Sequence, residues 1–136
     1  MVFDDVMLSD QTTIKEYFCK GRHNSASVFY LCQSLFKIAK HCIRDNANIF
    51  ILFRQNDHTL KYFHNDVISG DMEFKEFKSF CDKCWSNKHG FAVINLWEDP
   101  YCGRYISNYE LVYVPDQYMK RLNITNNYIK ITNNDK

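Results

Sequence analysis

The feature that most constrains the fold is a short apolar strand that ends in two adjacent acids. Val2 and Phe3 run directly into Asp4 and Asp5 before apolar residues resume. This pattern is typical of a buried strand that delivers carboxylates to the edge of a sheet, where open α/β proteins bind ligands. Asp4 would hold the water shell of a Mg²⁺ ion, and Asp5 would orient and deprotonate an attacking water. A surface turn that contains Asp-Asp is the alternative interpretation.

The segments that follow alternate between helix and strand. Ile14, Tyr17 and Phe18 fall at helical spacing. The apolar run 26–32 predicts a second strand, with Gln33 at its carboxyl end. Because a crossover helix of this size joins parallel neighbours, we expect the two strands to pair in parallel. The predicted fold class is therefore α/β, with a polar residue at the tip of each strand.

The same alternation continues along the chain. We expect helices over 35–43, 57–65 and 71–85, and strands over 48–53, 91–96 and 109–114. The helix over 71–85 has the strongest periodicity, because its apolar residues recur at intervals of three and four. Beyond Pro115 the composition becomes polar. We therefore expect one domain over 1–115 and a disordered tail over 116–136.

The charge balance excludes a general affinity for polyanions. Lys and Arg number 17 and Asp and Glu number 16, so any contact with nucleic acid has to be local. The basic residues Arg44, Arg54, Lys61 and Arg104 are scattered, and solvated surface charge is the expected reading of each. The longest apolar run, 49–53, is too short to span a bilayer. We expect an intracellular, non-secreted protein with no membrane partner.

The six cysteines are expected to be free thiols, most of them small core residues. Cys81 and Cys84 form a Cys-x-x-Cys pair with His89 nearby and His64 on an earlier helix, which invites a zinc interpretation. Both cysteines fall on the apolar stripe of their predicted helix, however, and there is no second Cys-x-x-Cys. Core packing is therefore the favoured interpretation, with a small zinc-binding domain as the less favoured one.

Three strings resemble a known family when taken together: Val2-Phe-Asp-Asp5, Tyr17-Phe-Cys-Lys-Gly-Arg-His23 and Val28-Phe-Tyr-Leu-Cys-Gln33. Their order is similar to the second half of the viral genome-packaging ATPases of the HerA/FtsK class. The resemblance continues through Ile43-Arg-Asp-Asn-Ala-Asn48, Ile51-Leu-Phe-Arg-Gln55, Asp71-Met-Glu-Phe-Lys-Glu-Phe77, Cys81-Asp-Lys-Cys-Trp85 and Gly103-Arg-Tyr105. It covers roughly residues 1 to 115.

The resemblance implies a RecA-like P-loop core with a mostly parallel sheet flanked by helices. Asp4 and Asp5 would be the metal-binding and catalytic acids of the Walker B strand, and Gln33 the sensor of the γ-phosphate or of the lytic water. Arg22 would be an arginine finger, because a planar, permanently charged donor stabilises phosphoryl oxygens. The alternatives remain a helix cap for Gln33 and a solvated connector for Arg22. The intact relative would use Mg and ATP in a homo-oligomeric ring that moves double-stranded DNA.

The sequence departs from the family in one serious respect. Nothing in it matches Gly-x-x-x-x-Gly-Lys-Ser/Thr, so it has no loop to cradle the phosphates. The proline that the family places near Ala39 is absent, and the basic cluster around Gly103 is reduced to Arg104. The resemblance therefore implies a fragment or remnant that lacks the Walker A strand and an N-terminal half, and that is inactive alone.

Two further expectations follow from the resemblance. In the family, the Walker A strand lies between the strands that correspond to 26–32 and 48–53. Without it, two apolar strand edges are exposed, and we expect marginal stability and aggregation. The alternative function is a non-catalytic interaction module derived from such an ATPase, located in the cytoplasm or nucleus of a host cell or in a virion.

Overall fold

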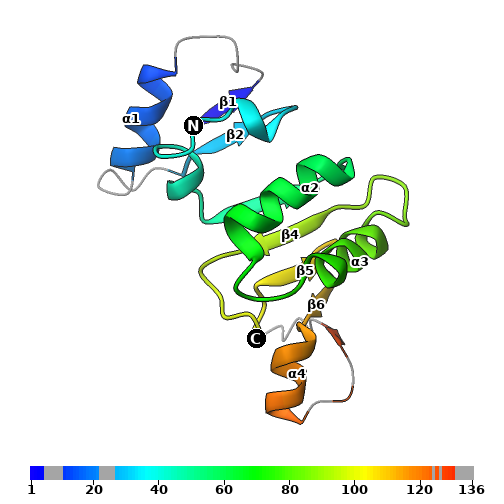
Figure 1. Cartoon of the computed structure of the whole chain (residues 1–136). Coiled ribbons are helices and arrows are strands. Elements are labelled where there is room, and N and C mark those ends of the chain that lie inside the picture. Colours follow the sequence, from blue (N-terminus) through cyan, green and yellow to red (C-terminus); the bar gives the residue numbers. More distant parts are fainter. Residues whose placement is uncertain (5–10, 22–26, 124, 126, 131–136) are drawn as a thin grey trace, which may run out of the picture. The chain divides into compact units, whose positions relative to one another are not determined.

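The computed structural model describes residues 1–4, 11–21, 27–123, 125 and 127–130 (Figure 1). The chain divides into two compact units, 1–47 and 48–136, where the sequence predicted one domain over 1–115. Both units combine helices with strands, which confirms the α/β class. No helix in these described ranges is long and apolar enough to cross a membrane.

The first unit is built around a parallel pair of strands. Strand β1 (Val2–Asp4) is followed by helix α1 (Thr12–Lys20) and strand β2 (Phe29–Leu31). The register pairs Val2 with Phe29 and Asp4 with Leu31, in the predicted parallel orientation. Helix α1 packs its aromatic residues on these strands, with Phe18 6.3 Å from Tyr30 between ring centroids.

The predicted helix over 35–43 is wrong. This stretch instead contains the 3₁₀ turn η2 (Leu35–Lys37) and leads into a second one, η3 (Arg44–Asn46). Ile38 between them has extended backbone angles, which interrupts the helical path. Apolar residues of this stretch are buried although they are not in an α-helix, because Ile38 and Ile43 form the core of this unit with Ile14.

The second unit contains a five-stranded sheet. Its strands, in their order across the sheet, are β3 (Ile49–Leu52), β4 (Ala92–Asn95), β5 (Tyr105–Ser107), β6 (Leu111–Tyr113) and β7 (Tyr128–Lys130). All four pairings are antiparallel, so the expectation of a mostly parallel sheet holds only for β1 and β2. One physical reason is the short connection from β5 to β6, in which Asn108 and Tyr109 adopt positive φ angles of 50° and 60°. Such a tight turn joins only antiparallel strands.

Helices α2 (Asp57–Phe63) and α3 (Phe74–Cys84) lie on the same face of this sheet (Figure 1). Asn56 caps α2 by accepting a hydrogen bond from the Thr59 N–H at 2.9 Å. The helix continues into a π-helical turn, η4 (His64–Ile68). The predicted periodicity of α3 is confirmed, because Phe77 and Phe80 are buried against the sheet.

Aromatic contacts join the helices to the sheet. The register places Phe50, Ile94, Tyr105 and Tyr113 in one row across neighbouring strands. Phe80 of α3 stacks on Tyr113 with ring centroids 5.1 Å apart and meets Tyr105 edge-on at 6.0 Å. Such contacts add to area burial and fix the position of α3 on the sheet.

Part of the stretch expected to be a disordered tail has regular structure. Helix α4 (Asp116–Leu122) buries Met119 and ends at Asn123, whose φ of 53° is left-handed. Strand β7 then pairs with β6, with Tyr128 opposite Tyr113. Both elements therefore contribute to the second unit.

Candidate functional site

The edge formed by β1 and β2 carries two of the predicted site residues. Asp4 is the last residue of β1, and its partner in the register is Leu31. Gln33 follows Leu31 by two residues, and both polar side chains are exposed. Because the strands are parallel, their carboxyl ends meet at the same edge. The pairing therefore brings Asp4 and Gln33 to one end of the pair. Asp5 and Arg22 lie outside the described residues.

The elements that position this edge are packed together. Phe3 of β1 contacts Tyr17 of α1 with ring centroids 5.7 Å apart. The Tyr30 hydroxyl of β2 donates a hydrogen bond to Gln11 Oε1 at 3.1 Å, at the start of α1. Helix α1 therefore contacts both β1 and β2, and these contacts stabilise the positions of the two strand ends.

The chemistry of this edge fits a magnesium ion only in part. Carboxylate and amide oxygens are ligands that Mg²⁺ accepts, usually through bound water. Within the described ranges, no group of three or more His, Cys, Asp or Glu side chains could hold a metal ion. The phosphates of a nucleotide have no glycine-rich loop to bind, because the sequence lacks one. Among its described residues this edge therefore offers two oxygen-bearing side chains, Asp4 and Gln33.

The Cys-x-x-Cys pair of α3 is a packing feature. Cys81 and Cys84 are fully buried. Burial raises the pKa of Cys84 to about 11 and also raises the pKa of Cys81. Among the described residues, neither thiol belongs to a group of three or more side chains that could hold a metal ion. His64 is engaged elsewhere, with Nε2 2.8 Å from the Met72 carbonyl oxygen. The core interpretation accounts for the pair.

The expectation for the remaining cysteines is wrong in one respect. All six lie in the described part of the chain and are free thiols, but three of them, Cys19, Cys32 and Cys102, are exposed. Only the α3 pair is fully buried, so most of the cysteines are not core residues. Cys32 directly precedes the candidate edge residue Gln33 in the chain.

Arg104 is not the solvated surface charge that the sequence suggested. Its Nη1 donates to Asp71 Oδ2 at 2.8 Å, and the side chains are only 21% and 13% exposed. The Tyr105 hydroxyl donates to the same carboxylate oxygen at 2.5 Å. Burial, followed by this bond to Asp71, raises the pKa of Tyr105. Arg44 is also buried, whereas Arg54 and Lys61 are exposed as expected.

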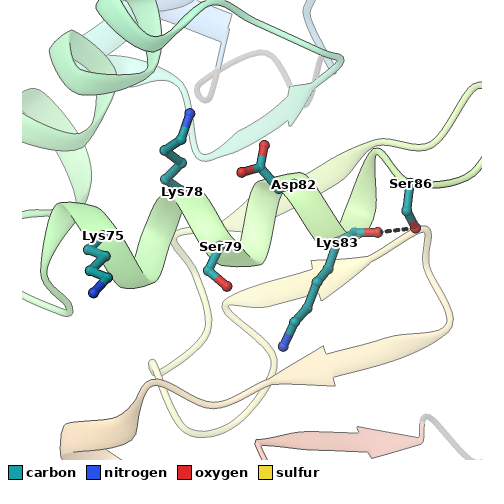
Figure 2. A pocket seen from close by; sticks show the side chains of 6 residues that line it. All are labelled: Lys75, Lys78, Ser79, Asp82, Lys83 and Ser86. Carbon is teal, nitrogen blue, oxygen red and sulfur yellow. Dashed lines mark hydrogen bonds between the residues drawn. The ribbon is translucent and has the colours of Figure 1, made fainter.

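Sequence reasoning did not single out a hollow on the outer side of α3. It is lined by Lys75, Lys78, Ser79, Asp82, Lys83 and Ser86 (Figure 2). A second hollow begins at the end of the helix and is lined by Phe53, Arg54, Trp85, Ser86, Asn87, Lys88, His89 and Gly90. The signal was present in the sequence, because the apolar stripe of α3 leaves its lysines and serines on the opposite side.

Comparisons with protein families, with curated proteins and with solved structures found no match for this chain. What the fold shows by itself is an α/β protein with a small parallel strand pair and a larger antiparallel sheet.

Proposed function

We propose that this chain carries the Walker B and sensor elements of a DNA-packaging or DNA-translocating ATPase of the HerA/FtsK class. The observation that supports this is the parallel pairing of β1 and β2, whose register brings Asp4 and Gln33 to one edge. A strand-helix-strand unit with polar residues at both strand tips is the arrangement that P-loop ATPases need for metal and water. The RecA-like core and its mostly parallel sheet belong to the same proposal.

Each residue has a role in the proposed ATPase. Asp4 would hold the water shell of Mg²⁺, and Asp5 would accept the proton of the attacking water. Gln33 would orient that water, and Arg22 would stabilise the transferring phosphoryl group of a neighbouring subunit. Bound Mg and ATP would supply the electrophilic phosphoryl group.

The open strand edges are compatible with the proposal. The resemblance places the Walker A strand beside the strands that correspond to β2 and β3. In the structure, β2 ends the parallel pair and β3 is the terminal strand of the antiparallel sheet. Both strands therefore have an edge at which another strand could add. A phosphate-binding loop would come from another segment, so this chain alone should not turn over ATP.

A chimera tests the proposed ATPase role. Residues 1–115 would replace the matching segment of an intact packaging ATPase, and Mg-dependent phosphate release would be measured. We expect turnover by the chimera and its loss, by at least 100-fold, on Asp5→Asn or Gln33→Ala, with nucleotide binding retained as evidence of folding. An unchanged rate in either variant contradicts the proposal. Mg-dependent turnover by the isolated chain that disappears on Asp5→Asn would contradict only the expectation that this chain is inactive alone.

A second candidate is a non-catalytic interaction module. It is favoured by the exposed apolar side chains on and just after the terminal strand β3, where Ile49 and Phe53 are 46% and 58% exposed. An unprotected edge strand pairs readily with another chain. Co-purification with an intact packaging ATPase, together with an inactive chimera, would favour this module over the catalytic role. An active chimera would exclude the purely non-catalytic reading.

A further inference from the structure

The hollow on the outer side of α3 and the hollow at the end of this helix share Ser86, and we call the surface that they line the basic band. Its positive side chains come from α3, from the loop after α3 and from the end of β3. They are Lys75, Lys78, Lys83, Lys88 and Arg54. Hydroxyl and amide groups lie among them, from Ser79, Ser86 and Asn87. All of these residues belong to the second unit.

Helical geometry sets the spacing of the charges. Lys75, Ser79 and Lys83 follow one another at intervals of four residues, and their side chains point to the same side of α3 in Figure 2. With a rise of about 1.5 Å per residue, the two lysines are separated by roughly 12 Å along the axis. Duplex DNA presents a phosphate about every 3.4 Å per strand, so this interval faces roughly three phosphates of one strand.

The local charge balance differs from that of the whole chain. Five cations line the band, against Asp82 in the band and Asp57, which accepts a hydrogen bond from Lys78. The excess is therefore three positive charges on this surface, whereas the complete chain has a formal charge of +1. Because the chain as a whole is nearly neutral, a contact with nucleic acid requires a local excess of positive charge, and the basic band has such an excess.

The surroundings of the band favour a hydrated polyanion over a membrane. A helix that inserts in a lipid surface needs an exposed apolar face. The apolar side of α3 is used in the core, because Phe77, Phe80 and Cys84 are fully buried. Phe53, which also lines the band, is exposed, but it follows β3 and does not give α3 an apolar face. Lysine ammonium groups with nearby hydroxyl and amide donors suit phosphate oxygens rather than base edges. This combination indicates binding that does not depend on base sequence.

We propose that the basic band binds the phosphate backbone of double-stranded DNA. This inference rests on the proposed function and deepens it, because it identifies the surface with which such an ATPase would contact its DNA. Lys75 and Lys83 are the central contacts, since they share one side of α3. Asp57 and Asp82 oppose binding, because Asp57 accepts a hydrogen bond from Lys78 and Asp82 points to the same side of α3 as Lys78 in Figure 2.

Fluorescence anisotropy of a labelled 25-base-pair duplex with the full chain tests the band at several salt concentrations. We expect Lys75→Gln/Lys83→Gln to weaken binding at least 10-fold. The slope of log Kd against log salt concentration should fall by about 2, because each of the two lost phosphate contacts contributes about 0.9 to that slope. Lys61→Gln/Lys120→Gln removes the same charge from exposed positions outside the band and should change Kd less than threefold. Circular dichroism checks that the variants are folded.

The opposite change gives a second, independent test. Asp57→Asn/Asp82→Asn should tighten binding severalfold, whereas Glu98→Gln/Glu110→Gln, at exposed positions that line neither hollow, should tighten it less. The proposal is overturned if both lysine pairs have equal effects, or if the wild type does not bind the duplex at 50 mM salt. It is also overturned if anionic vesicles bind the band while the duplex does not. The DNA-binding measurement contains no nucleotide. Its result therefore does not depend on whether the chimera hydrolyses ATP, and the two proposals can fail separately.

Discussion

Asp71 and Arg104 form a largely buried ion pair that connects the segment before α3 to the loop before β5, with 2.8 Å between Arg104 Nη1 and Asp71 Oδ2. The Tyr105 hydroxyl shares the carboxylate. Removing Asp71 would leave Arg104 without its counter-ion and Tyr105 without its acceptor. We therefore expect Asp71→Ala to lower the free energy of unfolding by about 2–3 kcal/mol, measured by urea denaturation.

The control for this pair is the exposed Asp82, which has the same chemistry at the surface. Asp82→Ala should change the free energy of unfolding by less than about 0.5 kcal/mol. Tyr105→Phe keeps the ion pair but removes one hydrogen bond, so a loss of about 1 kcal/mol is expected. Equal effects of Asp71→Ala and Asp82→Ala would show that the pair contributes no stability.

Glu76 of α3 holds the start of α4. Its Oε1 accepts hydrogen bonds from the Tyr113 hydroxyl at 2.8 Å and from the Asp116 N–H at 2.7 Å. Burial, followed by this bond to Glu76, raises the pKa of Tyr113. We predict that Glu76→Ala increases amide hydrogen exchange over 116–122 about 10-fold, while exchange in α2 stays as in the wild type. Unchanged exchange in α4 would contradict the role given to Glu76.

The parts of the fold that could be predicted from sequence carry a local signal. The stripe that includes Phe77 and Phe80 is long enough to identify α3, and the acids after Phe3 identify the tip of β1. Strand β5 was missed because three residues, Tyr105–Ser107, are too short for a clear alternation. The stretch 35–43 was misread because spacing of three and four residues is also compatible with 3₁₀ turns.

The candidate site could also be predicted from sequence only where the signal is local. The parallel pairing that brings Asp4 and Gln33 to one edge followed from the strand-helix-strand order. The partner of Arg104 could not be foreseen, because Asp71 is 33 residues away and the contact depends on how the loops fold. The position of Arg54 in the basic band could not be predicted for a related reason, because Arg54 follows β3 and reaches the end of α3 through a hydrogen bond to the Trp85 carbonyl oxygen at 3.2 Å.

Buried acidic groups make the second unit sensitive to alkali. Burial raises the pKa of Cys84 from its ordinary value of 9.0 to about 11. The unfolded chain therefore loses this proton first as pH rises, so the stabilisation is complete below pH 9 and is lost between about pH 9 and 11. We predict that the urea midpoint falls over this range. Cys84→Ala should reduce that pH dependence although it lowers stability at pH 8 by about 1 kcal/mol.

The matched control for alkali sensitivity is Cys102→Ala, at an exposed thiol. It should leave both the midpoint at pH 8 and the pH dependence as in the wild type. The remaining fall in the Cys84→Ala variant is expected between about pH 10 and 12, because burial raises the pKa of Tyr128 from 10.0 to about 12. An identical pH dependence in the wild type and Cys84→Ala would exclude Cys84 as a source of the effect.

The terminal strand β3 should make the chain prone to self-association. Ile51 is 43% exposed on this strand, and an apolar edge without a charge is a template for strand pairing. Ile51→Lys places a charge on the edge and should shift the protein at about 50 µM from large species toward monomer in size-exclusion chromatography with light scattering. Leu122→Lys, at an exposed apolar position at the end of α4, should leave the distribution unchanged. A wild-type chain that remains monomeric and melts cooperatively would contradict this prediction.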